Sequence, residues 1–359
     1  MRAPLRAWNA SLDDPIDLRA LAVLRIAMGP IVLIHLRPFL ESALDGIIYS
    51  DRFTLPFWDW YPELSRPAYL VLLAVTAAAA VLLSVGLFTR AAAWFTAAGV
   101  TYNVFLSQTH FHHNRAFLII LLVGLAVLPA GRTASLDAWR ARHRGVPLPN
   151  EGGTRLALTV LRFEIAVVYV ASGFSKLIDP DWWGGTVTRL RVEGHRPRLS
   201  EVGFPEGVID LLADPGFQSM AAKLIVLTEL FIGLGLLLRR TRKAAIWVAI
   251  PFHVAIQFTA AVQVFSFAAL AALVVWIDRP ARSRTLHVPE RSRWGRAIGV
   301  LDWTGRFNVD TGDGPITVSD GSRTLSGHEA RLFVLSRLPA TFWFAAPLQL
   351  LRRSQESAG

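Results

Sequence analysis

The chain has 359 residues, of which 53% are hydrophobic and 18% are charged, and its mean hydropathy is +0.40. This composition lies far from the soluble average and indicates a membrane protein with room for a helical bundle and a small appendix. The net charge of +10 arises from short basic clusters between apolar runs. Such clusters are typical of membrane orientation signals, so we expect a lipid bilayer, and no nucleic acid, as partner. The lack of cysteine excludes disulfides, thiolate metal sites and cysteine nucleophiles.

Four membrane spans are predicted in the first half of the chain. Residues 1–17 are polar and are not followed by a short apolar core with a small-residue cleavage site, so no cleaved signal peptide is predicted. The apolar runs that predict spans lie near residues 18–40, 67–88, 91–107 and 114–129. Because only two residues link the second and third runs, these helices should be antiparallel neighbours.

The second half of the predicted bundle begins with a central span, which starts near Leu156 and carries Lys176 at its far end. A long acidic loop, residues 178–218, follows. Three more spans are predicted near residues 219–238, 244–260 and 262–277. Lys and Arg concentrate in alternate connections, which favours about eight transmembrane helices in one all-α bundle. We therefore predict a multi-pass protein of the cell (inner or plasma) membrane with both termini cytoplasmic, although the short last two spans could form a re-entrant pair.

A change in composition divides the chain into a membrane domain, residues 1–278, and a small cytoplasmic tail, residues 279–359. The tail sequence ITVSDGSRTL has two short extended runs across Asp320-Gly321, which predicts a β-hairpin. Residues 327–338 have helical spacing. The apolar run 342–351 is too short to cross a bilayer and is expected to dock on the bundle or its membrane face.

Polar side chains at membrane depth are the candidates for chemistry, because each costs several kcal/mol unless it is satisfied. One interpretation is that these residues join helices in a packed interior, and the other is that they line a cavity for an amphipathic ligand or a proton. Their positions in the predicted spans are Arg25, Arg162, Glu164, Glu229, His253 and Gln257. Arg162 and Glu164 are two residues apart and cannot pair on one helix, so each needs a partner elsewhere in the bundle.

Lys176 is the leading candidate for a reactive group. On a helical wheel it shares a narrow stripe with Arg162, Tyr169 and Gly173, whereas Glu164 points to the opposite side. A lysine at a helix end can be a simple snorkelling anchor. The alternative is a general base in a partly dry place beside the Trp182-Trp183 pair. The cluster His110, His112 and His113 is expected on the same side, and no metal site is predicted from it.

These motifs resemble the membrane domain of the vitamin K-dependent gamma-carboxylase family, called HTTM in bacteria. The matching segments lie between about residues 17 and 278 and read LRIAMG, HNRAFLI, LPAGRTASLDAWR, RFEIAVVYVASGFSKLIDPDWWGG, LTELFIGLGLL and FHVAIQFTAAVQVFSF. The resemblance implies a reduced quinone, such as a vitamin K-like quinol, as the cofactor at the outer face. It assigns Lys176 as the base, and it directs attention to Tyr169, Trp182, Trp183 and Asn114 as cofactor-binding residues.

The chain differs from the carboxylase members in two ways that concern the reaction. The carboxylase members have an Asn-His-x-Tyr-Leu pattern where this chain has Asn114-Arg115-Ala116-Phe117-Leu118, so Arg115 stands in place of a family histidine. His113 is two positions earlier, about 200° away on a helix, and could substitute only in a non-helical backbone. A large outer domain that could hold a peptide is also missing. The resemblance therefore supports the family's fold for this chain more strongly than the family's reaction.

The tail segment VSDGSRTLSGHEARLFVLSRLPATFWFAAPL resembles the closing part of a DCC-type thiol-disulfide oxidoreductase domain. Because the cysteine pair of such domains is missing, the resemblance implies a remnant without redox activity. Three functions remain open for the whole chain. It could be a quinol-linked oxidase or carboxylase-like lyase that uses Lys176, or a non-catalytic scaffold that docks a partner. The third is a transporter or proton conduit based on Glu164, Glu229 and His253.

Overall fold

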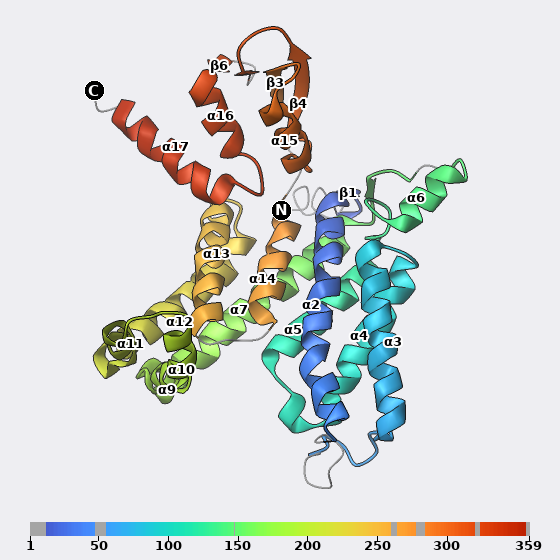
Figure 1. Cartoon of the computed structure of the whole chain (residues 1–359), viewed down its shortest axis with the longest axis vertical. Coiled ribbons are helices and arrows are strands. Elements are labelled where there is room, and N and C mark those ends of the chain that lie inside the picture. Colours follow the sequence, from blue (N-terminus) through green and yellow to red (C-terminus); the bar gives the residue numbers. More distant parts are fainter. Residues whose placement is uncertain are drawn as a thin grey trace, which may run out of the picture. The chain divides into compact units, whose positions relative to one another are not determined.

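The computed structural model describes residues 12–46, 55–146, 148–259, 264–277, 284–319 and 324–356. The chain forms two compact units, Met1–Trp276 and Ile277–Gly359, which are coloured blue to orange and orange to red in Figure 1. The first unit is built from helices, apart from one short antiparallel pair of strands, β1 (Ile16–Asp17) and β2 (Glu151–Gly152). The second unit contains a small sheet with helices.

All eight predicted spans correspond to helical segments in the first unit. Within the described ranges, four helices are long and apolar enough to cross a membrane: α2 (Arg19–Leu44), α3 (Arg66–Val85), α7 (Arg155–Ile178) and α12 (Pro215–Leu237). The others are α4 (Thr89–Leu106), α5 (His113–Val127), α13 (Arg242–Thr259) and α14 (Phe265–Ala272), which continues into η3 (Leu273–Trp276). The prediction of a helical membrane protein is therefore confirmed, while four helices of the described residues, rather than eight, reach the length and apolarity of a span.

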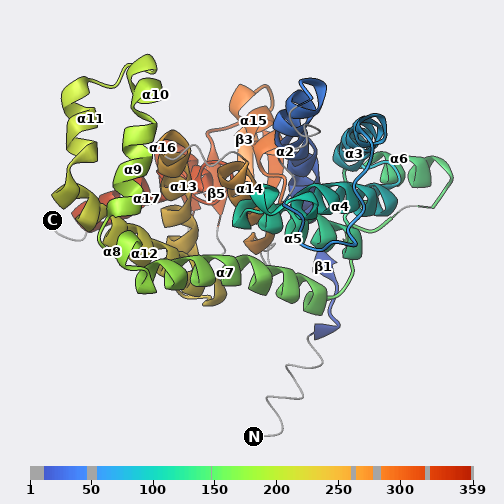
Figure 2. The same ribbon diagram turned by 90° about the horizontal axis from the view of Figure 1, so that it is seen from below.

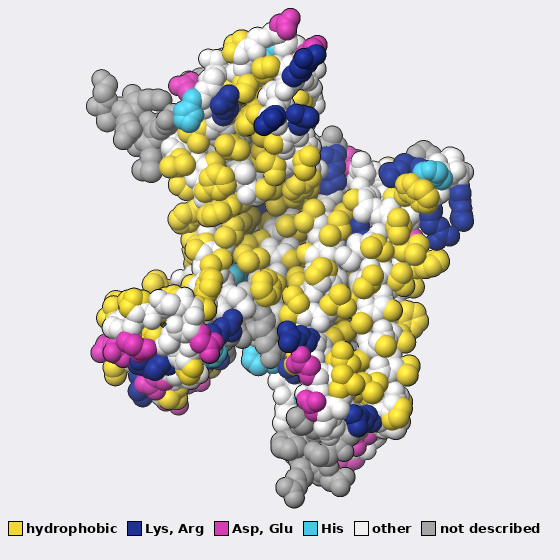
Figure 3. Space-filling model, viewed as in Figure 1, with side chains coloured by type: hydrophobic (Ala, Val, Ile, Leu, Met, Phe, Trp, Pro, Cys, Tyr) yellow, Lys and Arg dark blue, Asp and Glu magenta, His cyan; other side chains and the backbone are white. Residues whose placement is uncertain are grey.

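The surface of the first unit fits a lipid environment. Outward-facing side chains on α3 and α4 are large and apolar, and Val71, Val75 and Phe95 are all exposed. Figure 3 shows hydrophobic side chains over the middle of the α2–α4 region, with charged side chains gathered toward its two ends. An apolar band between charged ends is the surface expected of a protein embedded in a bilayer, where charges are costly.

The turn between α3 and α4 confirms that these helices are antiparallel neighbours, and Figure 1 shows them side by side. Gly86 ends α3 in the left-handed conformation with φ of 73°, which glycine adopts without steric cost. Asp137 then caps α4, because its carboxylate accepts the backbone N–H groups of Phe88 and Thr89 at 2.9 Å each. The short helix α6 (Leu136–His143) thus holds the start of α4.

The predicted acidic loop 178–218 is folded into four short helices. They are α8 (Pro180–Trp183), α9 (Thr186–Gly194), α10 (Arg196–Glu201) and α11 (Glu206–Ala213). Val192, Leu199 and Ile209 form their small apolar core. We call α8–α11 the helical cap. Figure 2 shows the cap adjoining α7 and α12 at one end of the first unit. Helices of four to nine residues show too few turns for a clear apolar period, which is why the sequence reads as a loop.

The second unit contains a four-stranded sheet in the order β4-β3-β5-β6. Strands β3 (Arg284–Pro289) and β4 (Phe307–Gly312) are parallel and are linked by α15 (Arg293–Leu301). Strands β5 (Thr317–Ser319) and β6 (Thr324–Ser326) are antiparallel, with Val318 opposite Leu325. The sequence predicted this last pair as a hairpin, and its turn residues Asp320-Gly321 lie outside the described residues. The β3-α15-β4 unit was not predicted, because its strands lie in a charged, Gly/Pro-rich stretch.

Two helices complete the second unit: α16 (Gly327–Leu335), which was predicted, and α17 (Phe342–Glu356). The apolar core contains Leu286, Val288, Ile298, Phe307 and Phe333. The alternation of buried and exposed residues along β3 places Leu286 and Val288 on the core side of the sheet. The likeness of this unit to a DCC-type domain, and the docking of residues 342–351, stay predictions.

Candidate functional site

The C-terminal end of α7 holds a buried ion pair. Lys176 Nζ lies 2.6 Å from each carboxylate oxygen of Glu229 on α12. It also donates to Ser172 Oγ, one turn earlier on α7, at 2.6 Å, and the Ser172 hydroxyl donates to Glu229 Oε1 at 3.3 Å. The Lys176 side chain is 15% exposed and that of Glu229 is 6% exposed. The two opposite charges thus satisfy each other inside a largely apolar helix pair.

Two glycines bring α7 and α12 close enough for this pair. A Cβ atom on Gly173 would lie 2.9 Å from Leu230 Cγ, and one on Gly233 would lie 2.9 Å from the backbone oxygen of Ala166. Distances this short leave no space for a larger residue, so both helices approach through small side chains, as is common in membranes. Gly233 is one turn from Glu229, so the close crossing places the carboxylate against Ser172 and Lys176.

The helical cap covers the pair with an aromatic ring and a second cation. Lys176 Nζ lies 4.9 Å from the centre of the Trp182 ring, and the guanidinium carbon of Arg191 lies 5.0 Å from it. Asp179 fixes the start of α8 by accepting the backbone N–H groups of Asp181 and Trp182 at 2.9 and 3.3 Å. Desolvation lowers the pKa of Arg191, and the negative charge of Glu229 opposes that shift. Arg191 is therefore part of the electrostatic surroundings of the pair.

Trp183 has a different neighbour. Its ring centre is 5.7 Å from Lys223 Nζ on α12, and this amine donates to Ser219 at 3.1 Å. The turn between the two tryptophans and α9 is fixed by Gly185, which has φ of 88° and whose added Cβ would lie 2.5 Å from the backbone nitrogen of Ser219. The segment 179–185 after α7 therefore directs Trp182 toward Lys176 and Trp183 toward Lys223.

A second polar contact lies deeper in the first unit. The Tyr169 hydroxyl is 2.6 Å from His253 Nε2 on α13, and both side chains are buried. The His253 ring also packs against Phe265 of α14, with ring centres 5.4 Å apart. In the part of the chain that the structure describes, His253 Nδ1 and Gln257 Oε1 are buried and have no hydrogen-bond partner. The structure thus joins Tyr169 and His253, which sequence reasoning had placed on separate helices without pairing them.

The histidine cluster is held at the start of α5. His112 Nδ1 accepts the backbone N–H of Asn114 at 3.2 Å, which caps the helix. Burial lowers the pKa of His112, and the charges of His113, Arg115 and Arg191 lower it further. Arg191 of the helical cap is therefore among the charges that act on His112.

Arg115, which stands in place of the family histidine, contacts a carbonyl group and an aromatic ring. It donates to the backbone oxygen of His110, and its guanidinium carbon lies 4.7 Å from the centre of the Phe39 ring. Helix α5 begins at His113, so His113 and Arg115 leave the helix in directions about 200° apart. His113 therefore does not occupy the direction that Arg115 takes.

The two other intramembrane arginines bond backbone carbonyl groups. Arg25 is fully buried and donates to the oxygens of Leu83 and Ser84 at 2.8 and 2.6 Å and also to that of Ala134. Arg162 donates to the oxygen of Val275 in η3, through Nε at 2.8 Å and through Nη2. Carbonyl groups at helix ends lack intrahelical donors, so both arginines satisfy helix termini and hold separate segments together.

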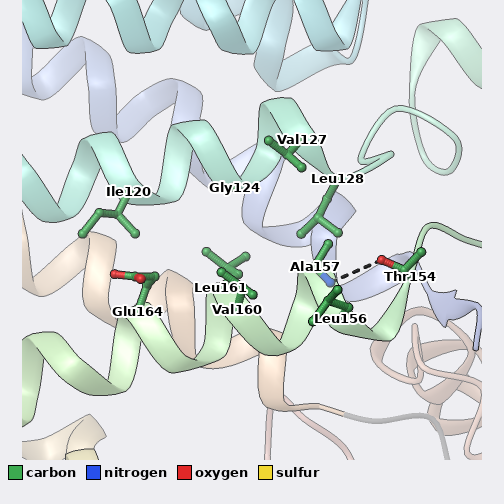
Figure 4. Close-up of a pocket in the computed structure, with 10 residues that line it drawn as sticks. All are labelled: Ile120, Gly124, Val127, Leu128, Thr154, Leu156, Ala157, Val160, Leu161 and Glu164. Atoms are coloured by element: carbon green, nitrogen blue, oxygen red, sulfur yellow. Dashed lines mark hydrogen bonds between the residues drawn. The ribbon is translucent and has the colours of Figure 1, made fainter. Parts of the chain in front are cut away.

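Sequence reasoning missed two members of the site. Ser172 is four residues before Lys176, and this spacing could have indicated a shared face. Arg191 lies in a stretch read as a loop, and its only signal was a positive charge among acidic residues. The remaining intramembrane candidate, Glu164, lies away from this site, in a groove between α5 and α7 shown in Figure 4.

Long apolar helices that bury paired charges define the first unit as that of a helical membrane protein with several spans. The family model of the HTTM domain matches residues 14–279, and the chain therefore belongs to the HTTM family of vitamin K-dependent carboxylase-like membrane proteins. The resemblance seen in the membrane-domain motifs is thereby confirmed. No curated protein and no solved structure matches the chain.

Proposed function

We propose that the protein binds a reduced quinone, or a similar lipid-soluble quinol, beside Lys176 and that the Lys176–Glu229 pair takes up a proton from it. The observation that carries this proposal is the ion pair itself, with Nζ 2.6 Å from both carboxylate oxygens and beside the Trp182 ring. A flat aromatic face next to a proton-exchanging group suits a flat, hydroxyl-bearing ring.

Each residue around Lys176 has its own role in this proposal. Trp182 and Arg191 line the place where the ring binds, and a bound quinol supplies an acidic hydroxyl group and reducing electrons. When Lys176 passes its proton to Glu229, the pair becomes an amine and a carboxylic acid, both neutral and both hydrogen-bonded. Neutral partners are favoured in dry surroundings. The amine at Lys176 then accepts a proton from the bound hydroxyl, and the resulting ammonium stabilises negative charge beside it.

The first experiment supplies purified protein in lipid with a panel of reduced quinones and oxygen, and measures oxidised products. Lys176→Ala should abolish protein-dependent product formation while the variant keeps the elution volume of a folded protein, and it should unfold at a lower temperature because Glu229 loses its counter-charge. Lys223→Ala is the matched control, because it removes the neighbouring lysine beside Trp183 and should retain turnover. If no quinone is turned over by the unchanged protein, the enzyme proposal fails.

The competing function is a non-catalytic membrane scaffold. It is favoured by the arginines, since Arg25 and Arg162 bond carbonyl groups of other segments and thus act as joints between helices. On this view the Lys176–Glu229 pair is a third joint. Lys176→Ala would then reduce stability, and no quinol-dependent activity would exist to be lost.

We also propose that the eight helical segments all cross the cell membrane, with both termini in the cytoplasm. The alternation of basic connections supports this topology. Because the chain has no cysteine, single cysteines can be introduced and labelled with a membrane-impermeant maleimide on intact cells. Glu201→Cys in the helical cap should be labelled at once, and Arg144→Cys after α6 only when the membrane is permeabilised. The reverse result would invert the topology.

A further inference from the structure

A groove separate from the Lys176 site lies between α5 and the first half of α7 (Figure 4). It has a volume of about 350 Å³, in the lower part of the range of small-molecule sites. Its walls are aliphatic and include Ile120, Val127, Leu128 and Val160. Figure 4 shows Glu164 beneath Ile120 at one end and Thr154 at the other. The groove is thus an apolar channel with one acidic end.

The Glu164 carboxylate has no ion pair or hydrogen bond with any of the residues that the structure describes. The two basic residues nearest to it in the sequence of α7 bond other groups. Arg162 bonds the oxygen of Val275, and Arg155 pairs with Asp14 at 3.1 Å. The groove therefore presents negative charge with no positive charge among its lining residues.

The other polar group at the groove does not change this balance. The Thr154 hydroxyl accepts the backbone N–H of Ala157 at 3.3 Å, which caps the start of α7. Thr154 and Glu164 are ten residues apart on one helix, so a ligand that spans them is about 15 Å long. Val127, Leu156 and Val160 are each about half exposed, and in a bilayer they open the groove to the hydrocarbon.

We propose that this groove binds a hydrophobic amine that enters from the bilayer. Its ammonium group pairs with Glu164, and its hydrocarbon body lies along Leu161 and Leu128 toward Thr154. A carboxylate at membrane depth is costly without a partner, and a cationic amphiphile supplies one while also burying the aliphatic walls. The inference concerns a different face of α7 from the quinol proposal, so either can hold without the other.

The test measures binding of tritiated dodecylamine to the full chain in lipid nanodiscs. Glu164→Gln removes the charge and keeps the shape, and it should weaken binding by at least about tenfold. Ala157→Phe fills the groove while leaving Glu164 in place, and it should weaken binding to a similar extent. If that variant does not fold, Val160→Trp takes its place. Glu201→Gln, in the helical cap and outside the groove, is the matched control and should bind like the unchanged protein.

Competition identifies the chemistry of the ligand. Unlabelled dodecylamine should displace the probe, whereas dodecanol, with the same chain and no charge, should not. With a hydrophobic carbodiimide, dodecylamine bound at Glu164 should be captured as an amide of that carboxyl group, and the carbodiimide leaves as its urea. The proposal is overturned if Glu164→Gln binds the probe normally, or if dodecanol competes equally well. It is also overturned if Glu164→Gln changes the oligomeric state, since that result would assign the groove to a contact between copies.

Discussion

Arg25 and Lys176 are both basic residues buried in long apolar helices, but the fold satisfies them in different ways. Arg25 is fully buried and bonds three backbone carbonyl groups, none of which can exchange a proton. Lys176 meets a carboxylate, a hydroxyl group and an aromatic ring, and 15% of its side chain stays exposed. The comparison shows that membrane depth alone does not mark a reactive residue. The two charges differ in their partners, since a carbonyl group cannot exchange a proton and a carboxylate can.

The largest expected effect comes from Arg25→Ala. The change removes the guanidinium donor from carbonyl groups of α3 and of the α5–α6 connection, and each bond to a charged group contributes about 1.5–3 kcal/mol. We expect a loss of about 4 kcal/mol in unfolding free energy, measured by denaturant unfolding in detergent micelles. Arg90→Ala, an exposed arginine at the start of α4, is the control and should change little. Equal stability of the two variants would show that Arg25 does not hold these segments together.

Glu229→Leu should come next, because it leaves the Lys176 amine buried without a counter-charge. We expect a loss of about 3 kcal/mol in the same unfolding experiment. Adding Lys176→Met to Glu229→Leu removes both charges and should restore much of the lost stability. If the effects of the two changes simply add, the residues are not coupled and the ion pair does not exist in solution.

Tyr169→Phe should have a smaller effect. It removes the hydroxyl group that meets His253 Nε2 at 2.6 Å, which leaves a second buried nitrogen of that ring unsatisfied. The expected loss is about 1–2 kcal/mol. Tyr61→Phe is a suitable control, because its hydroxyl bond is long, at 3.4 Å, and only partly buried. A Tyr169→Phe variant as stable as that control would contradict the Tyr169–His253 contact.

The smallest effect is a pH dependence from the start of α5. Burial lowers the pKa of both His110 and His112 below their ordinary value of 6.5. The unfolded chain therefore binds more protons than the folded protein once the pH falls below about 6.5, so unfolding free energy should decrease as pH falls through that region. His112→Gln should flatten this dependence, measured as unfolding midpoint against pH. A steeper dependence in the variant would show that His112 is stabilised in its protonated form.

The sequence predicted the elements of the first unit better than their partnerships. Apolar runs located every long helix, because a membrane-spanning helix needs a long apolar stretch. The stripe on α7 was also informative, since Gly173 packs on Leu230 and Lys176 meets Glu229. The pairing itself could not be predicted, because Lys176 and Glu229 are 53 residues apart and their contact depends on the register of α7 against α12. Likewise, Arg162 lies on the predicted stripe with Lys176, but its guanidinium group donates to the backbone oxygen of Val275.

The helical cap and the sheet of the second unit show where sequence periodicity fails. The core of the cap uses only three fully buried apolar residues, and the helices around them are too short to show a period of 3.6. Strand β3 was not predicted from the sequence, because it carries Arg284 and His287 next to its core residues. Arg191 therefore went unnoticed as a neighbour of the site, although its place beside Trp182 follows directly once the cap is folded.

Photolabelling can show whether a quinol binds beside the Lys176–Glu229 pair. A photoreactive naphthoquinol is bound to the full chain in nanodiscs, irradiated, and the labelled residues are mapped by mass spectrometry. We expect labels at the end of α7 and in α8–α9, around Trp182 and Arg191, and we expect these labels to be lost in Lys176→Met but kept in Lys223→Met. Labels confined to the Glu164 groove, or labelling unchanged by Lys176→Met, would contradict it.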